Sequence, residues 1–366
     1  MGLKAGIIGL PNVGKSTIFN ALTKSAIPAD NYPFCTIDPN IGIVEVPDNR
    51  LNAIAKIYSP KATTPTTIEF VDIAGLVRGA SKGEGLGNQF LSNIRDVNAI
   101  IHIIRAFETN DITHIDGNLD PIRDIETIET ELLIKDILSI EKRIDKLNKT
   151  IRMGDKDAKI ELSIFDYILP KMNDGTLVRN IPLDSKQKQI LQILSLLTNK
   201  PTLYVLNIDE NQIINTKTIP NFNNLINFIN TKGDEIILLS GKIESEISTL
   251  NKNEIDFYLK EYNISEPGLN KLVKATYNLL KLETFFTAGE KEVRAWTIKK
   301  GTLAPKAASE IHSDIERGFI KAEVFSYEDL MHLKSETAIK DAGKVRLEGK
   351  NYIVQNGDII LFKFNV

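Results

Sequence analysis

Short apolar runs alternate with segments of helical periodicity along residues 3–120. The apolar runs cover 4–8, 41–46, 67–71 and 99–106, and apolar residues recur at helical spacing over 16–22 and 48–58. A short apolar run bounded by polar or glycine residues is typical of a buried strand, whereas a period of 3.6 residues is typical of a helix. The alternation predicts an α/β domain, in which helices cover the faces of a mostly parallel sheet.

Residues 122–200 carry no strand signal. Isoleucine and leucine recur at helical spacing from residue 122 onwards, so we predict a helix over 122–148 that is about 40 Å long. Two further helices are predicted over 157–172 and 184–197, and the turn at 153–155 would join the first two into an antiparallel hairpin. The pattern predicts an α-helical arm inserted into the α/β domain. Its charged faces are expected to be solvated surface rather than a binding surface for a partner.

The α/β domain is predicted to resume at Pro201. Apolar runs over 203–207 and 235–240 predict two more strands, and helices over 254–280 close the domain. We therefore assign residues 1–281 to one domain that contains the arm.

The end of the chain changes character. Runs at 284–288 and 293–298 are typical of paired strands, and a helix over 304–313 has Pro305 near its start. Further strands are predicted at 320–325, 345–348 and 359–364. Two strands, a helix and then more strands fit a small β-grasp-like fold, so we assign residues 282–366 to a second domain.

Composition narrows the class of protein. The chain has 366 residues, with 42% hydrophobic and 25% charged residues, which are ordinary values for globular domains. A net charge of −3 argues against wholesale wrapping of nucleic acid, and we expect no specific DNA partner. A single cysteine excludes an intramolecular disulfide and fits a reducing compartment. No apolar run is long enough to span a bilayer and Met1 almost adjoins the first strand, so we expect a cytoplasmic protein without a membrane partner.

A phosphate-binding motif follows the first predicted strand. Residues 9–16 are Gly-Leu-Pro-Asn-Val-Gly-Lys-Ser, which is G-x-x-x-x-G-K-S between a strand and a helix. The glycines let the backbone curl so that its N–H groups face a polyphosphate, and the start of the helix adds its own free N–H groups. Lys15 is expected to reach the β- and γ-phosphates, and the Ser16 hydroxyl to bind Mg²⁺. The nucleotide-binding residues predicted here are Asn12, Val13, Gly14, Lys15, Ser16 and Thr17.

Two further segments are typical of a nucleotide-dependent switch. Asp72 to Gly75 spell D-x-x-G at the end of an apolar strand, where the aspartate holds Mg²⁺, usually through water, and the Gly75 N–H bonds the γ-phosphate. Thr36 lies in a loop between the first helix and the next strand, where a switch threonine closes on the metal. The alternative for Thr36 is an ordinary loop hydroxyl. The predicted metal ligands are Ser16, Thr36 and Asp72.

The segment that reads the base departs from the guanine-specific pattern. Such sites carry N-K-x-D after a strand, whereas this chain has Asn207-Ile208-Asp209-Glu210. The longer carboxylate of Glu210 would leave guanine donors unpaired, at a cost of about 1–3 kcal/mol, and adenine has no 2-amino group to lose. We predict that Asn207, Ile208 and Glu210 bind the base, that Ile208 packs on a purine face, and that ATP is preferred. The carboxylate of Asp209 leaves a guanine contact open.

The residue that orients the catalytic water is not the usual glutamine in this chain. In Ras-type enzymes a glutamine after D-x-x-G orients the attacking water, and this chain has Leu76 there. His114, in a loop past a strand end, is the candidate to position water, with a surface loop histidine as the equal alternative. Arg78 and Lys82 could stabilise transition-state charge or be solvated.

Three other side chains have competing interpretations. Asn12 could help to hold K⁺ against the phosphates, or could only shape the loop. His102 lies in the middle of an apolar strand and is predicted to be a core residue. Phe107 follows the same strand, where packing near the base and packing in the core are equally plausible.

These motifs resemble those of the Obg-like ATPase family, known as YchF in bacteria. The matching stretches are residues 9–16, 31–40, 72–80 and 207–210 together with the C-terminal region, and they span nearly the whole chain. The resemblance implies a translation-factor-class P-loop protein that prefers ATP, with a nucleotide domain, an inserted helical arm and a C-terminal TGS domain. It also implies association with the ribosome, as large subunit and as whole ribosome.

Two functional classes remain. The first is a slow Mg²⁺-dependent ATPase whose nucleotide state sets its affinity for the ribosome, in translation or its stress regulation. The second is a scaffold that binds ribosomes or other proteins whatever the nucleotide, with incidental hydrolysis, and a GTPase-type ribosome factor is a further alternative. Leu76 favours slow intrinsic turnover in both classes.

Overall fold

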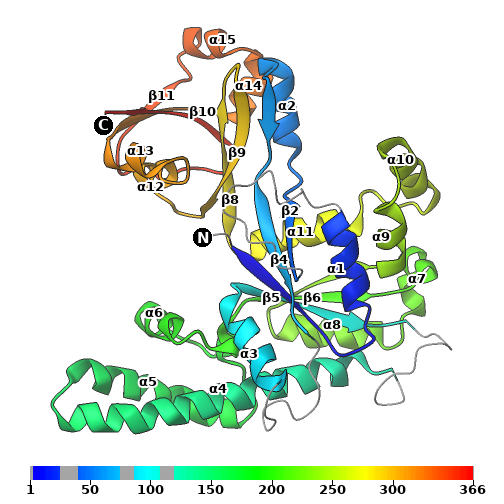
Figure 1. The fold of residues 1–366 in the computed structure, drawn as a ribbon, viewed down its shortest axis with the longest axis vertical. Helices are drawn as coiled ribbons and strands as arrows, with labels where there is room; N and C mark the ends of the chain where they lie inside the picture. The colour runs from blue at the N-terminus through cyan, green and yellow to red at the C-terminus, as the bar shows by residue number, and fades with distance from the viewer. Residues whose placement is uncertain (1–2, 25–39, 75–85, 108–118, 366) are drawn as a thin grey trace. The chain divides into compact units, whose positions relative to one another are not determined.

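The computed structural model describes residues 3–24, 40–74, 86–107 and 119–365 (Figure 1). Its contacts divide the chain into two compact units. One unit comprises Met1–Gly42 and Glu69–Leu272, and the other comprises Ile43–Ile68 and Val273–Val366. This division differs from the predicted boundary at residues 281 and 282, because an early segment groups with the C-terminal part of the chain.

A six-stranded sheet forms the centre of the first unit, in the order β2-β4-β1-β5-β6-β7. Its strands are β1 (Lys4–Ile8), β2 (Ile41–Glu45), β4 (Thr67–Asp72), β5 (Ala99–Arg105), β6 (Thr202–Asn207) and β7 (Glu235–Leu239). The pairs β1/β4, β1/β5, β5/β6 and β6/β7 are all parallel. β5 and β6 are buried along their whole length, as expected for strands that are covered on both faces. The predicted α/β fold with a mostly parallel sheet is confirmed.

Helices beside this sheet bury their apolar faces. α1 (Lys15–Lys24) buries Ile18, Phe19, Ala21 and Leu22, and α3 (Leu86–Asp96) contributes buried Phe90, Leu91 and Ile94. The remaining helices after β6 are α7 (Glu210–Ile214), η4 (Thr216–Thr218), α8 (Phe222–Thr231), α9 (Gly241–Ile247), α10 (Lys252–Glu261) and α11 (Gly268–Leu279). Because the strands are parallel, their carboxyl ends meet at one edge, and the loops that follow them converge there.

The predicted helical arm is present as two helices packed side by side (Figure 1). α4 spans Pro121–Arg152 and α5 spans Lys156–Asn173, and their shared core includes Leu147, Phe165 and Ile168. With 32 residues, α4 is about 48 Å long. It continues four residues beyond the predicted end, and Ile151 in this last turn packs against the shared core.

The last arm helix is shorter than predicted. α6 covers Ser185–Ile193 rather than 184–197, and a 3₁₀ turn, η3, follows at Leu197–Asn199. The buried carboxylate of Asp136 accepts hydrogen bonds from the backbone N–H groups of Leu197 and Thr198, at 2.9 and 2.8 Å. It also accepts one from the Thr198 hydroxyl at 2.7 Å. These bonds satisfy the amides that begin η3, whereas α6 itself ends before Ser195, whose φ of 48° is in the left-handed region.

The second unit has its own six-stranded sheet, in the order β11-β10-β12-β8-β9-β3. Its strands are β3 (Ala62–Thr64), β8 (Leu282–Ala288), β9 (Glu292–Lys299), β10 (Phe319–Ser326), β11 (Arg346–Glu348) and β12 (Asp358–Phe364). β8 and β9 form an antiparallel hairpin, β12 pairs with β8 in parallel, and β10 pairs with β11 and β12 in antiparallel fashion. This arrangement is the β-grasp-like one that the strand pattern predicts.

The helices of this unit differ in part from the prediction. The single helix predicted over 304–313 is two short helices, α12 (Ala304–Ala308) and α13 (Ser313–Arg317), and the Nδ1 of His312 accepts a hydrogen bond from Asp314 N–H at the start of the second. α14 (Tyr327–Leu333) and α15 (Glu336–Asp341) were not predicted, since both are short. Among the described helices, none has both the length and the apolar content of a membrane-spanning helix.

Contacts group the early segment 43–68 with the second unit. It forms α2 (Asn49–Tyr58), which was predicted at 48–58 within the first domain, and the short strand β3. Leu51 and Ile54 of α2 pack in one cluster with Phe286 of β8, and β3 pairs in parallel with β9. The helix was predicted at the right place in the sequence, but periodicity does not say which sheet a helix covers.

His102 lies in the buried strand β5, as predicted for a core residue. It is 2% exposed, its ring centroid is 5.6 Å from that of Tyr204, and burial lowers its pKa to about 4, although Glu129 opposes this shift. The unfolded chain would bind a proton near pH 6.5, where the folded chain does not. Below that pH the folded state therefore loses stability until the pH reaches about 4.

Replacing His102 with Leu should remove this part of the pH dependence. Between pH 8 and pH 5 the wild-type protein should lose about 2 kcal/mol more unfolding free energy than His102→Leu. Urea denaturation at a series of pH values measures the difference. Parallel stability curves for the two proteins would contradict a neutral, buried His102.

Candidate functional site

A cavity of about 920 Å³ lies in the first unit, where segments following four parallel strands converge. Its volume is of the size that holds a cofactor-sized ligand. The lining residues are Leu10, Pro11, Asn12, Gly14, Lys15, Ser16, Thr17, Phe107, Asn207, Ile208, Asp209, Glu210, Ser240, Gly241, Lys242 and Ser245. The cavity thus brings the predicted phosphate loop and the predicted base segment together.

The phosphate loop has a backbone that only certain residues can adopt. Asn12 has a φ of 65° and Gly14 a φ of 88°, both in the left-handed region. A Cβ on Gly14 would lie 2.1 Å from the Nδ2 of Asn207, and a Cβ on Gly9 would lie 2.8 Å from the carbonyl oxygen of Ile103. Both glycines are therefore required for close approach, and the loop leads directly into the first turn of α1, whose N–H groups are available to an anion.

Asn207 holds two loops of the cavity in place. Its side-chain Nδ2 donates to the carbonyl oxygen of Val13 at 2.9 Å, and its Oδ1 accepts from the N–H of Gly241 at 2.9 Å. Asn207 is 4% exposed and Val13 is 2% exposed, so water cannot readily replace these bonds. The predicted base-binding asparagine has both amide atoms engaged in holding the phosphate loop against the start of α9.

Asp209 is the N-cap residue of α7. Its carboxylate accepts from the backbone N–H of Gln212 at 2.9 Å, and the Gln212 side-chain oxygen accepts from the N–H of Asp209 at 2.9 Å, which is a capping box for α7. The Gln212 Nε2 donates to the carbonyl oxygen of Ala106 at 3.0 Å. These bonds favour the interpretation in which Asp209 does not reach guanine.

The other two residues of the base segment have different environments. Ile208 is only 2% exposed and packs in a cluster with Ile104 and Leu206, so most of its side chain lies in the core rather than against a base. Glu210 begins α7, and its Oε1 lies 2.6 Å from the Nζ of Lys242. The Lys242 ammonium therefore competes for the carboxylate that would have to accept hydrogen bonds from guanine.

Phe107 is an aromatic residue in the lining of the cavity. The Arg105 guanidinium lies 4.7 Å from the centroid of this ring, and the Arg105 Nε donates to the Phe107 carbonyl oxygen at 2.9 Å. The stacked arginine fixes the orientation of the ring, which makes Phe107 the aromatic side chain available to a base in this cavity.

Two of the predicted metal ligands, Asp72 and Ser16, lie at the predicted phosphate loop. Asp72 ends β4, in register with Ile7 of the neighbouring β1, and its carboxylate forms an ion pair with the Nζ of Lys15. The Ser16 hydroxyl is exposed at the start of α1. A hydroxyl and a carboxylate are the hard oxygen donors that Mg²⁺ prefers alongside water and phosphate oxygens. Within the described ranges, no group of three or more His, Cys, Asp or Glu side chains is arranged to hold a metal ion.

The other predicted site residues lie outside the described ranges. They are the metal ligand Thr36, the phosphate contact Gly75, the water-positioning candidate His114, and Leu76, Arg78 and Lys82. Their roles stay predictions.

The segment after β7 was missed at the sequence level. Ser240, Gly241, Lys242 and Ser245 line the cavity, and the Ser240 hydroxyl caps α9. Small residues directly after a buried parallel strand were the available signal, because a parallel sheet places every such loop at the same edge.

Comparisons with known proteins identify the family. Residues 282–365 match the model for the C-terminal part of YchF GTPases, described as a protein of unknown function, and residues 4–142 match that of a 50S ribosome-binding GTPase. The chain is 52% identical to the ribosome-binding ATPase YchF of Haemophilus influenzae and 51% identical to that of Bacillus subtilis, over 100% of each chain. The chain belongs to the YchF family. The resemblance seen in the motifs is thus confirmed.

Solved structures agree with this assignment. The YchF GTPase of Schizosaccharomyces pombe is 39% identical, with a TM-score of 0.89 over 99% of this chain and 98% of that one. A GTP-binding protein from Pyrococcus horikoshii OT3 is 20% identical with a TM-score of 0.64, which shows the fold alone. The names of these relatives include both ATPase and GTPase.

Replacing Asn207 with Ala should weaken nucleotide binding at least tenfold. The change leaves the Val13 carbonyl and the Gly241 N–H buried without a partner, at a cost of about 1–3 kcal/mol each. A fluorescent nucleotide titration with Mg²⁺ measures the affinity. Asn211→Ala, at an exposed position on α7, is the matched control and should bind as wild type does. Equal affinities for both variants would show that the clamp is dispensable.

Proposed function

We propose that this protein is a Mg²⁺-dependent nucleoside triphosphatase that prefers ATP to GTP, binds the ribosome and acts as a nucleotide-dependent switch. The observation that carries the proposal is the single cavity lined by both the phosphate loop and a base segment without the guanine-reading pattern. The names of the bacterial relatives, which are ribosome-binding ATPases, support the same function.

The phosphate end would bind the triphosphate in the following way. Lys15 leaves its partner Asp72 and contacts the β- and γ-phosphates, with backbone N–H groups of residues 12–17 around them. Ser16, Asp72 and Thr36 would hold Mg²⁺, which neutralises charge that develops on the phosphates. Without a nucleotide, Lys15 and Asp72 neutralise each other. When the nucleotide binds, the phosphates would take the place of Asp72 beside Lys15, and Mg²⁺ would take the place of Lys15 beside Asp72, so both side chains stay charge-compensated.

The base end favours adenine. Asp209 caps α7 and Glu210 pairs with Lys242, so neither carboxylate is arranged to accept the two donors of guanine. Phe107 offers a ring that stacks on either purine. Because guanine would lose hydrogen bonds to water without replacement, while adenine has fewer donors to satisfy, the cavity discriminates against GTP.

The chemistry requires water to be oriented by a group other than the residue at position 76. His114 is the proposed residue, with Arg78 or Lys82 as donors to transition-state charge. Asn12 lines the cavity in a left-handed conformation and is proposed, as an alternative, to help hold K⁺. Slow basal turnover follows, since the Leu76 side chain cannot hydrogen-bond the attacking water.

The ribosome would contact surfaces outside the cavity. Neither the helical arm nor the C-terminal unit, which we propose to be a TGS domain, contributes residues to the lining of the cavity. The match of residues 4–142 to a 50S ribosome-binding GTPase supports the large subunit as partner. That description, and the GTPase name of the fission yeast relative, favour a GTP-using ribosome factor as the second candidate.

Calorimetry with ATP and GTP separates these candidates. ATP should bind at least tenfold more tightly than GTP in the presence of Mg²⁺, because guanine donors lack acceptors in the cavity. The Lys15→Ala variant should bind neither ATP nor GTP. This control verifies that the measured binding occurs at the phosphate loop. GTP binding tenfold more tightly than ATP would overturn the nucleotide assignment.

Single-turnover ATP cleavage tests the catalytic proposal. Ribosomes should raise the rate, and His114→Ala should lower it at least tenfold with ATP affinity within twofold of wild type, as expected for a contact made mainly in the transition state. His332→Ala, at an exposed position in the C-terminal unit, is the matched control. Equal cleavage by His114→Ala and wild type, with and without ribosomes, would remove His114 from the mechanism.

A further inference from the structure

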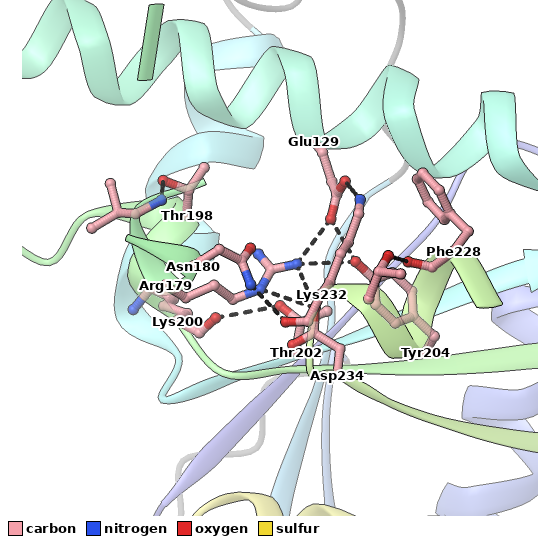
Figure 2. A network of polar contacts seen from close by, with 12 residues as sticks. Glu129, Arg179, Asn180, Thr198, Lys200, Thr202, Tyr204, Phe228, Lys232 and Asp234 are labelled. Atoms are coloured by element: carbon pink, nitrogen blue, oxygen red, sulfur yellow. Dashed lines mark hydrogen bonds and ion pairs between the residues drawn. The ribbon is translucent and has the colours of Figure 1, made fainter. Parts of the chain in front are cut away.

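Five polar side chains meet at the root of the arm, as Figure 2 shows below α4. They come from four parts of the first unit that are distant in sequence. The residues are Glu129 of α4, Arg179 of the 3₁₀ turn η2 (Val178–Asn180), Tyr204 of β6, and Lys232 and Asp234 between α8 and β7. We refer to these five residues as the arm joint.

Arg179 is the centre of the arm joint. Its guanidinium lies 2.8 Å from Glu129 Oε1, and it donates to the hydroxyl of Tyr204 at 3.0 Å. Two of its nitrogens donate to Asp234 Oδ2, at 3.2 and 3.0 Å. A planar guanidinium can satisfy partners from three directions at once, which a lysine ammonium on a flexible stem cannot reproduce.

Glu129 is the second centre. Its carboxylate accepts hydrogen bonds from the Tyr204 hydroxyl and from the Nζ of Lys232, in addition to the contact with Arg179. Burial alone would raise the pKa of Glu129, but the charges of Arg179 and Lys232 outweigh it and lower the pKa. Two cations thus balance two anions, and every member of the arm joint has a partner.

Most of the arm joint is shielded from water: Lys232 is 20% exposed and lines a surface cavity with Glu129 and Arg179, and the other members are less exposed. Tyr204 is 0% exposed, and the side chains of Glu129, Arg179 and Asp234 are each 10% exposed. Breaking one contact would leave a buried charge without compensation, which is strongly unfavourable. A shift of α4 over the sheet therefore requires the whole set to rearrange, and such a cluster favours discrete arrangements over gradual sliding.

The two strands beneath the arm joint lead directly to the cavity. Tyr204 lies three residues before Asn207 on β6, and the base segment 207–210 follows at once. Asp234 immediately precedes β7, whose end is followed by the cavity residues 240–242. Asn207 links the two strand ends, because it accepts from the Gly241 N–H. The same pair of strands is thus anchored to the arm at one end and to the nucleotide cavity at the other.

We propose that the arm joint couples the position of the arm to the nucleotide in the cavity, with Arg179 and Tyr204 as positioning residues. This inference rests on the proposed function, in that a nucleotide must occupy the cavity. In the ATP-bound protein the strand ends close on the base and phosphates, β6 and β7 shift together, and the arm joint carries this change to α4. A ribosome that holds the arm would act on the cavity through the same contacts.

Hydrogen exchange of the full chain tests this coupling without ribosomes. Backbone amides of residues 121–140 and 174–181 are compared with Mg²⁺ and either a non-hydrolysable ATP analogue or ADP. Exchange in these segments should differ at least threefold between the two nucleotides in the wild-type protein. Tyr204→Phe removes one hydroxyl with little change of shape, and should abolish the difference while calorimetric affinity stays within twofold of wild type.

Two further variants make the test specific. Tyr167→Phe removes a hydroxyl from within the arm, where it donates to the carbonyl oxygen of Pro182 at 3.2 Å, and should retain the nucleotide-dependent difference. Arg179→Lys keeps the charge but loses the multiple contacts, and should abolish the difference independently of Tyr204.

Three outcomes would overturn the proposal. Exchange at the arm root that is identical with both nucleotides in wild type shows that no coupling exists. A full difference in both Tyr204→Phe and Arg179→Lys shows that coupling bypasses the arm joint. Absence of nucleotide binding in calorimetry would instead reject the proposed function, and this inference with it, so the two failures are distinguishable.

Discussion

The side-chain amide of Asn207 is the contact on which the candidate site depends. It holds the carbonyl of Val13 and the N–H of Gly241 in a region without ready access to water, and Gly14 must lack a side chain for the amide to fit. One residue thereby fixes both the phosphate loop and the loop after β7. The parallel sheet makes this possible, because it delivers the ends of β1, β6 and β7 to the same edge.

The same geometry explains how one pair of strands can serve two ends of the first unit. β6 and β7 are hydrogen-bonded along their length, with the arm joint at their beginning and the cavity at their end. Because side chains around these two strands are close-packed, a displacement of one strand end moves the other end rather than being taken up by loose packing in between. The Lys15 and Asp72 ion pair adds a charge that must be exchanged when a nucleotide binds, so occupancy of the cavity has a local electrostatic consequence as well.

The parts of the fold that depend on local residue spacing could be predicted from the sequence. The phosphate loop and the long arm helix depend on residue spacing, and both are where the pattern places them. Features set by distant contacts could not be predicted: α2 packs on β8, which no periodicity reveals, and Asp136 of α4 binds the amides that begin η3. At the site, Asn207 was predicted as a base contact, but its bond to Gly241 depends on the fold. The signal for Ser240 and Gly241 was only their position as small residues directly after a buried strand.

Nucleotide occupancy of the cavity is expected to set the affinity of the protein for the ribosome. Cosedimentation of the full chain with ribosomes, in the presence of a non-hydrolysable ATP analogue, ADP or no nucleotide, measures this dependence. Dissociation constants for the ATP-analogue and ADP states should differ at least tenfold, or about 1.4 kcal/mol, and a Lys15→Ala variant should show no such difference. An affinity that is the same in all three conditions would contradict a nucleotide-dependent switch and show that the protein binds ribosomes as a scaffold.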